Sequence, residues 1–226
     1  MGVLIAGGTG ALGSAVVREL LDADYDCSVT WVAEKELERA RAELGDRVTF
    51  VRADLVDPAG GADAAVAAVE DLEAVVDLVG GFADGPLVHE TGWGDFERML
   101  RLNIAPAFNL AHAAMPRLVE RGGGAFVAVS ARAALRPFSG AAGYITAKAA
   151  VIAFVQALDA EYRKQGVRAN AILPSVIDTP AIRSSQPDAD HSNWVRPEAI
   201  AKVVRHLVSA DGAVTSGGAI PVYGRA

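Results

Sequence analysis

The sequence has few of the residues that mark disulfide-rich, zinc-binding or nucleic-acid-binding proteins. Its one cysteine, Cys27, excludes a disulfide within the chain, and no spacing resembles a zinc site, so we expect no metal. The formal net charge is −7 and no cluster of Lys and Arg stands out, which argues against nucleic acid as a partner. Aromatic residues make up only 6%, but hydrophobic residues reach 51%. A chain of this composition folds around a large core.

Long apolar runs are also missing. None reaches the length of a membrane span, and no charged region with a cleavage site precedes the apolar segment that begins at Gly2. We therefore expect a cytoplasmic protein without a membrane partner. The 226 residues fit one α/β domain, and no linker or internal repeat divides them. A single domain over residues 1–226 is expected.

Short apolar runs alternate with helical patterns along the chain. Strands are expected at 3–6, 27–32, 48–52, 74–79, 125–130, 167–173 and 219–222. Helices are expected at 10–21, 34–43, 62–70, 93–120, 142–165 and 197–209. The strands are apolar throughout, as burial of both faces requires. The pattern predicts an α/β fold: a single doubly wound Rossmann domain with a seven-stranded, mainly parallel sheet flanked by helices.

A glycine-rich turn follows the first strand and opens the first helix. Gly7 allows the tight turn, Gly10 lets backbone N–H groups approach a pyrophosphate, and Gly13 lets the helix pack closely on the sheet. The helix N-terminus adds partial positive charge. We expect this turn to bind the phosphates of a nicotinamide dinucleotide through Gly7, Thr9, Gly10, Ala11, Leu12 and Gly13.

The adenosine end of the cofactor site is less specific. An acidic residue at the end of the second strand would favour NAD, and an arginine would favour NADP. The strand instead ends in neutral residues, followed by Glu34 and Lys35, which have opposite preferences. Both NAD and NADP therefore stay open. Asp54 and Leu55, after the third strand, are expected at the adenine edge.

Tyr144 and Lys148 are the candidate catalytic pair. Four residues apart on a helix, they share one face. A phenol has an unperturbed pKa of about 10, and a neighbouring ammonium lowers that pKa. Tyr144 is then able to exchange a proton with a substrate oxygen while hydride moves. The pair follows the fifth strand of a Rossmann pattern, where the carboxyl ends of the strands face the ligand crevice.

With these motifs the chain resembles the short-chain dehydrogenase/reductase family nearly end to end. The resemblance rests on the glycine turn, Asp54, Asn103, the Tyr144/Lys148 pair, residues 174–180 and the ending 216–220. It implies an NAD(P)-dependent oxidoreductase acting on a small carbonyl, alcohol or imine. It further implies that Asn103 supports a proton relay to Lys148 and that Thr179 binds the nicotinamide carboxamide. Pro174, Ile177, Gly80 and Gly81 are expected to line the cofactor.

Two departures from the family pattern concern catalysis. The fourth strand usually ends Asn-Asn-Ala-Gly, and here the residues are Asp77, Leu78, Val79 and Gly80. The usual catalytic serine position holds Ala131, so Ser130 beside it becomes the candidate hydroxyl. Neighbouring side chains on a strand point to opposite faces. Whether Ser130 faces the substrate therefore stays open, since a local bulge could turn it.

Within the family, three stretches are most similar to dihydropteridine reductases: residues 7–14, 79–85 and 173–194. Reduction of a pterin is therefore an alternative activity, although the acidic NADH-selecting residue of those enzymes is missing. A non-catalytic dinucleotide sensor on the same fold is an alternative of another class. The retained Tyr144, Lys148 and Asn103 argue against the sensor, because binding alone does not require them.

Further expectations concern the substrate and the assembly. The polar segment 180–196 is longer than an ordinary connection and is expected to form a lid over the substrate. Phe82 and Trp194 are the candidate substrate contacts. The long apolar helices at 93–120 and 142–165 predict a homodimer or homotetramer built on these helices.

Overall fold

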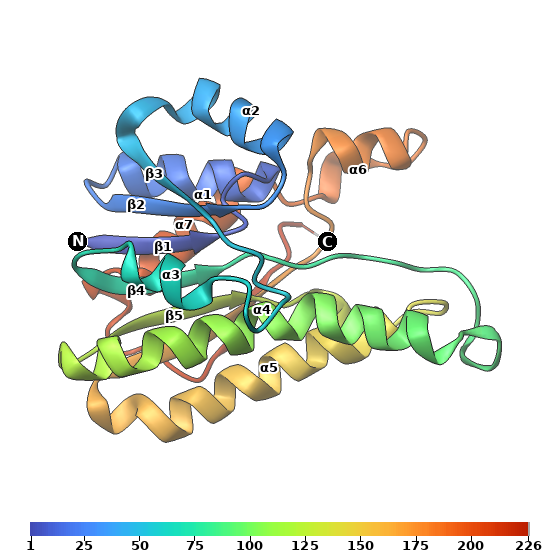
Figure 1. Cartoon of the computed structure of the whole chain (residues 1–226). Helices are drawn as coiled ribbons and strands as arrows, with labels where there is room; N and C mark the ends of the chain where they lie inside the picture. Colours follow the sequence, from blue (N-terminus) through green and yellow to red (C-terminus); the bar gives the residue numbers. More distant parts are fainter. Residues whose placement is uncertain (226) are drawn as a thin grey trace.

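The structure, a computed structural model, describes residues 1–225. Within this range one sheet has the parallel order β3-β2-β1-β4-β5-β6-β7, as the doubly wound prediction requires. The strands are β1 (Gly2–Ala6), β2 (Asp26–Trp31), β3 (Val48–Arg52), β4 (Leu72–Asp77), β5 (Gly124–Val129), β6 (Val167–Pro174) and β7 (Ala219–Val222). The predicted fold class is confirmed (Figure 1).

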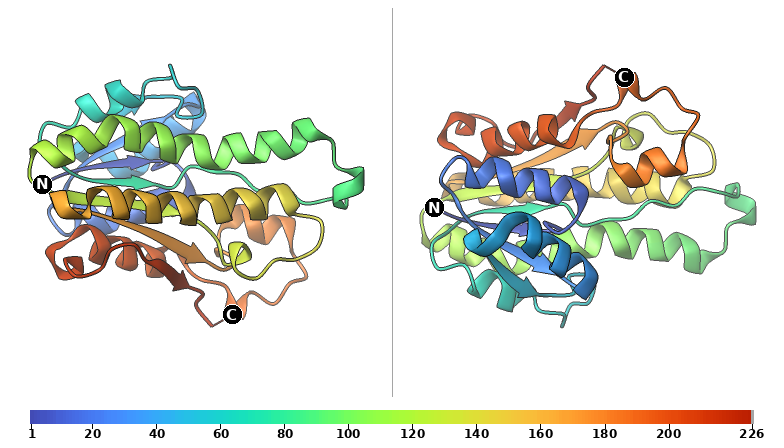
Figure 2. Two further views of the ribbon diagram at one scale, coloured as in Figure 1. Left: turned by 90° about the horizontal axis from the view of Figure 1, so that it is seen from below. Right: turned by 90° about the horizontal axis from the view of Figure 1, so that it is seen from above.

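Helices cover both faces of this sheet. One face packs against α1 (Ala11–Leu21), α2 (Glu34–Leu44) and α7 (Pro197–Val208). The other packs against α3 (Ala62–Ala67), α4 (Trp93–Glu120) and α5 (Ala142–Tyr162). Figure 2 shows α4 and α5 side by side along the second face. Within residues 1–225, no helix has both the length and the apolar character that crossing a membrane requires.

The strand order places a ligand crevice at the carboxyl edge of the sheet. From β1 the chain winds outward through β2 and β3, then returns to pair β4 with the other side of β1. Neighbouring loops therefore leave in opposite directions at β1 and β4, and the space between them is where ligands bind in open α/β sheets. The glycine turn follows β1, and Gly80 and Gly81 follow β4.

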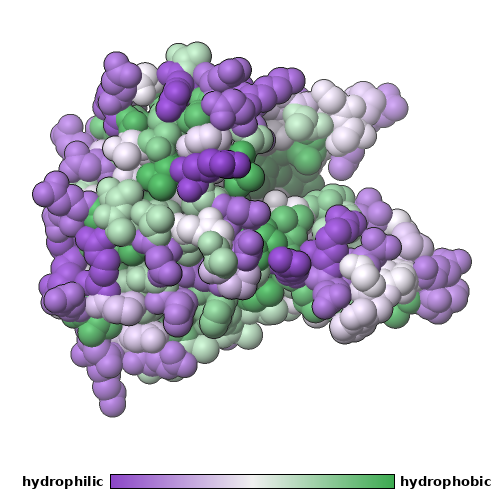
Figure 3. Space-filling view, viewed as in Figure 1, coloured by the Kyte–Doolittle hydropathy of each residue, from purple (hydrophilic) through white to green (hydrophobic). Residues whose placement is uncertain are grey.

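Two segments project beyond this edge. Residues 80–92, here called the arm, leave the end of β4 and run outward to the start of α4, and Figure 1 shows the outer end of this segment far from the sheet. Opposite the arm lies α6 (Pro180–Ser185), inside the segment predicted as a polar lid without a helix. The helix forms because Thr179 accepts a hydrogen bond from the Ile182 N–H and Pro180 occupies the first turn. The hydropathy-coloured surface shows a hollow with an apolar floor between α6 and the arm (Figure 3).

Candidate active site

The glycine turn has the close backbone contacts expected of a phosphate-binding loop. Gly7 has φ +75°, in the left-handed region that favours glycine. A Cβ on Gly13 would lie 2.1 Å from the Gly7 carbonyl oxygen, so only glycine lets α1 pack here. No side chain caps the N-terminus of α1, and its first turn holds no acidic residue. Its free N–H groups and partial positive charge therefore suit an anionic phosphate.

Two charged side chains of α2 reach this turn, and sequence reasoning missed both. Thr9 is buried, and its hydroxyl donates to the Glu36 carboxylate at 3.1 Å. Arg39 donates to the Thr9 carbonyl oxygen at 2.7 Å. Their spacing of three residues on a helix was the available signal, because it places them on one face. Glu36 has the chemistry to bind a ribose hydroxyl, and Arg39 has the chemistry to bind a phosphate.

Of the two residues predicted at the adenine edge, only Asp54 presents its side chain to solvent. The Asp54 side chain is exposed and accepts a hydrogen bond from the Val56 N–H at 3.0 Å. The Leu55 side chain instead lies in the core, and its carbonyl oxygen accepts a hydrogen bond from Asn109. Any contact of Leu55 with a cofactor would therefore be through its backbone. Val32, at the end of β2, is exposed and neutral.

The turn after β4 brings Asn103 and Lys148 together. The Asn103 side chain accepts from the Gly81 N–H and donates to the Gly81 carbonyl oxygen, both at 3.1 Å. A Cβ on Gly80 would lie 2.6 Å from Asn103 Oδ1 and 2.9 Å from Lys148 Nζ. Glycine at position 80 thus lets the backbone touch both side chains. A Cβ on Gly81 would meet Leu102 at 2.3 Å.

Tyr144 lies one turn before Lys148 on α5, with its ring in edge-on contact with Phe82 at a centroid distance of 5.0 Å. Burial raises the pKa of Tyr144 to about 12. This differs from the lowered phenol pKa expected from the neighbouring ammonium. The Lys148 ammonium donates to the Val129 carbonyl oxygen at 3.0 Å, and burial is the cause of the Tyr144 shift. The phenol is therefore protonated at neutral pH and suited to donate a proton.

Ser130 lies beside the position of the usual catalytic serine, and its hydroxyl faces the backbone of α5. It is buried, and its hydroxyl donates to the Lys148 carbonyl oxygen at 2.6 Å. The residue follows the end of β5 without the bulge that would turn it toward the crevice. The assignment of Ser130 as a catalytic candidate stays a prediction, which Ser130→Ala tests. The hydroxyl supports the turn of α5 that carries Lys148.

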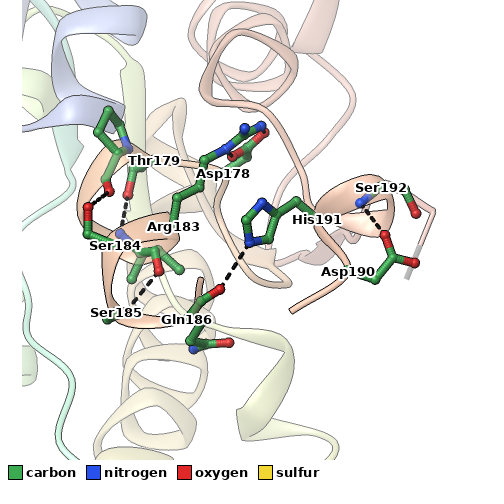
Figure 4. Close-up of polar contacts among 11 residues, drawn as sticks. Asp178, Thr179, Arg183, Ser184, Ser185, Gln186, Asp190, His191 and Ser192 are labelled. Carbon is green, nitrogen blue, oxygen red and sulfur yellow. Dashed lines mark hydrogen bonds and ion pairs between the residues drawn. The ribbon is translucent and has the colours of Figure 1, made fainter. Parts of the chain in front are cut away.

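The lid is tied together at its base and within itself (Figure 4). Ile177 pairs with Val195, so residues 178–194 form a loop closed by backbone contacts. Arg183 donates to both oxygens of Asp178, which lowers the pKa of Asp178. His191 contacts the Gln186 carbonyl oxygen, and its ring lies 4.1 Å from Trp194. Thr179, the predicted carboxamide ligand, uses its hydroxyl to cap α6, while Pro174 is buried at the end of β6.

The residues present fit a nicotinamide dinucleotide. The glycine turn excludes any Cβ at Gly13 and leaves α1 uncapped, and the Gly80 backbone lies directly against Lys148 and Asn103. These two halves face each other across the β1–β4 switch point. No three His, Cys, Asp or Glu side chains of residues 1–225 gather as metal ligands.

Comparison with known proteins gives the family. The model of the short-chain dehydrogenases matches residues 2–190, so the chain belongs to this family. The chain is 31% identical to the 3-beta-hydroxysteroid dehydrogenase of Comamonas testosteroni, over 95% of this chain and 91% of that protein. It is 27% identical to the 2-(R)-hydroxypropyl-CoM dehydrogenase of Xanthobacter autotrophicus, over 98% and 96%.

Solved structures agree on the fold. ElxO with NADP bound superimposes with a TM-score of 0.90 at 22% identity, covering 98% of this chain and 96% of that one. The protein is accordingly an oxidoreductase of the short-chain dehydrogenase family, and its glycine turn and uncapped α1 fit the NAD(P) cofactor class. The named relatives give no support to the dihydropteridine reductase resemblance, and their enzymatic names do not favour the sensor.

Proposed function

We propose that this protein interconverts a ketone and a secondary alcohol, with Tyr144 as the proton donor and acceptor. The observation that carries the proposal is the meeting of Tyr144, Lys148 and Asn103 at the switch point, beside the glycine turn. The two named relatives are dehydrogenases of a hydroxysteroid and a hydroxypropyl compound, which supports an alcohol carbon as the reacting centre.

The chain's own residues supply binding, orientation and the proton. A bound nicotinamide would donate or accept the hydride. The glycine turn would hold the phosphates, and Lys148 would hold the ribose beside Gly80. Tyr144, a phenol whose pKa burial raises to about 12, is protonated at neutral pH and would donate its proton to the carbonyl oxygen as charge develops there. Turnover with a panel of ketones, followed by NAD(P)H absorbance, tests this activity.

An apolar ring is the substrate feature that the site favours. Phe82 lies beside Tyr144 at a centroid distance of 5.0 Å, and Phe138 lies on Phe82 at 6.4 Å. Both rings are about half exposed, at 53% and 49%, so their faces are open to a ligand next to the phenol. Aromatic side chains of this kind bind flat apolar groups by stacking or edge contacts.

Replacing Phe82 with alanine is therefore expected to raise KM for a cyclic ketone about two- to tenfold, with a smaller change in kcat. A lost aromatic contact of roughly 0.5–1.5 kcal/mol accounts for that factor. Trp93→Ala is the control, because Trp93 is also exposed but stacks on Phe96 instead of Tyr144. Equal KM values for the Phe82 variant and the unchanged protein would remove Phe82 from the substrate site.

The lid is expected to close over substrate, with Trp194 as its latch. Trp194 packs on His191 within the loop, and its large apolar surface stands just before α7. We expect Trp194→Ala to raise KM while the melting temperature changes little. Hydrogen exchange of residues 181–195 should slow when cofactor and substrate bind. Equal protection in both states would identify a fixed loop, with Trp194 serving only to anchor α7.

The assembly proposed is a homodimer or homotetramer through the outer face of α4 and α5. Phe108 is 54% exposed there, with the His112 and Phe154 rings 6.0 and 6.2 Å away. A two-fold axis would bury this cluster against its own copy. Phe108→Glu is expected to yield monomers in sedimentation velocity at micromolar concentration. Val214→Glu, at an exposed apolar residue elsewhere, should leave the assembly intact. A monomeric unchanged protein would contradict the proposal.

A further inference from the structure

Asp77 is a buried carboxyl group that the mechanism above does not use. It ends β4 and is only 2% exposed. One carboxylate oxygen accepts a hydrogen bond from the Val79 N–H at 3.0 Å, which shapes the turn leading to Gly80. An asparagine, the residue usual at this point of the family pattern, would accept that bond equally well. The hydrogen bond explains a polar residue at position 77, but it does not explain a charged one.

Lys148 is the charged group on the other side of this turn. It is 4% exposed, and the hydrogen bond it makes is to the Val129 carbonyl oxygen. Val129 follows Ala128, and Ala128 is the register partner of Asp77 on the neighbouring strand. Gly80, three residues after Asp77, lies against Lys148 Nζ from the crevice side. The carboxyl and the ammonium groups therefore converge on the same turn from β4 and from α5.

Burial makes each charge costly without the other. A buried ammonium that meets only a neutral carbonyl is an uncompensated charge, and removing its partner charge is strongly unfavourable. Burial lowers the pKa of Lys148, and the Asp77 charge opposes that fall. Burial also raises the pKa of Asp77, and the Val79 N–H together with Lys148 opposes that rise.

The other groups packed around the pair carry no competing charge. Asn103 from α4 is a neutral amide, and Tyr144 from α5 is a protonated phenol at neutral pH. Ser130, at the end of β5, is neutral and bonded to the α5 backbone. Among the residues described, the Lys148 charge shifts the pKa of Asp77, and the Asp77 charge shifts the pKa of Lys148.

We propose that Asp77 is the buried counter-charge that keeps Lys148 protonated, and thus a positioning residue for proton transfer at Tyr144. The proposal rests on the proposed function for its catalytic consequence. The electrostatic part stands on the protein alone, because the protonation of Lys148 is measurable without any substrate. An ammonium held charged in this way is able to bind the ribose through the N–H donors that the Val129 carbonyl oxygen does not use.

The direct test is an NMR titration of the full chain labelled with ¹³C at the lysine ε carbon. The sequence holds four lysines, so the Lys148 signal is readily assigned by its loss in Lys148→Gln. In Asp77→Asn, which preserves the acceptor for the Val79 N–H, we expect the Lys148 midpoint to fall by about one pH unit or more, a tenfold change in its acid constant. An unchanged midpoint would overturn the proposal.

Asp159→Asn is the matched control. Asp159 is also a buried carboxylate, but it binds Arg163 and Ser216 at the far end of α5. Its replacement is expected to lower the melting temperature without moving the Lys148 midpoint. If Asp77→Asn does not fold, Asp77→Ser is the second neutral variant for the same titration. An unchanged Lys148 midpoint in that variant would overturn the proposal.

Activity gives the second readout. In the reduction direction the alkaline limb of the pH profile should follow the loss of the Lys148 proton. We expect Asp77→Asn to move that limb to lower pH by the same interval as the NMR midpoint, and Asp77→Glu to restore part of the shift. A merely structural role would lower the melting temperature and leave the limb in place. Failure of the proposed function would show separately. The Lys148 midpoint would still fall in Asp77→Asn, but turnover would not depend on Tyr144.

Discussion

Replacement of Tyr144 by phenylalanine is expected to reduce turnover by about 10²–10⁴-fold, the usual contribution of a general acid–base group. The variant keeps the ring and its edge contact with Phe82, and so keeps the local packing. It loses the hydroxyl that would donate a proton to the carbonyl oxygen. The measurement is the initial rate of NAD(P)H oxidation with the best ketone of the panel, together with cofactor affinity by fluorescence.

Cofactor affinity should survive this substitution, because Lys148 and the glycine turn are unchanged. Ser130→Ala is the comparison, since its hydroxyl bonds the α5 backbone instead of facing the phenol. We expect a smaller loss of rate for the serine variant than for the tyrosine variant. A Tyr144→Phe variant with the rate of the unchanged protein would refute the catalytic assignment, and an equally large loss for Ser130→Ala would give Ser130 a part in the reaction.

Gly13→Ala is expected to have the second large effect, on cofactor binding and stability. The new Cβ would lie 2.1 Å from the Gly7 carbonyl oxygen and 2.5 Å from the Gly8 Cα, both backbone atoms that cannot move independently. The helix must shift away from the turn, and overpacking of this kind costs roughly 1–3 kcal/mol. We expect cofactor affinity to fall by about tenfold or more and the melting temperature to drop.

Gly94→Ala is the matched control for this prediction. Gly94 lies in the first turn of α4, and a Cβ there would have no neighbour within 4 Å. Alanine is the better helix former, so stability should stay equal or rise slightly. Equal cofactor affinity for Gly13→Ala and Gly94→Ala, by fluorescence titration, would mean that close approach at position 13 does not matter for binding.

Local sequence patterns were enough to predict the fold and the outline of the site. The seven apolar runs gave the seven strands of the described chain within about two residues at each end, because continuous burial leaves a clear signal. The helix at 62–70 ends earlier, at Ala67, and the segment after Thr179 contains the unexpected α6. Both differences concern short helices, whose ends depend on capping contacts more than on hydrophobic periodicity.

Side-chain direction was the main feature that the patterns could not supply. The direction of Ser130 stayed open in the sequence analysis. Alternation along a strand predicts that Ser130 and Ala131 point to opposite faces, but it does not predict which face meets the substrate. The Lys148 carbonyl oxygen, 2.6 Å away, settles its direction. Likewise, Glu36 and Arg39 reach Thr9 only because α2 folds back beside the glycine turn, a contact across 27 and 30 residues of sequence.

The sequence by itself determined the family, the parallel sheet, the glycine turn and the Tyr144/Lys148 spacing, since these depend on residues close together in the chain. The tertiary structure decided what each polar group faces. Tyr144 is partly buried, so its pKa is raised instead of lowered, and the Lys148 ammonium donates to the Val129 carbonyl oxygen within the field of Asp77. Burial and charge act through space between β4, β5 and α5, and no local pattern along the chain contains those distances.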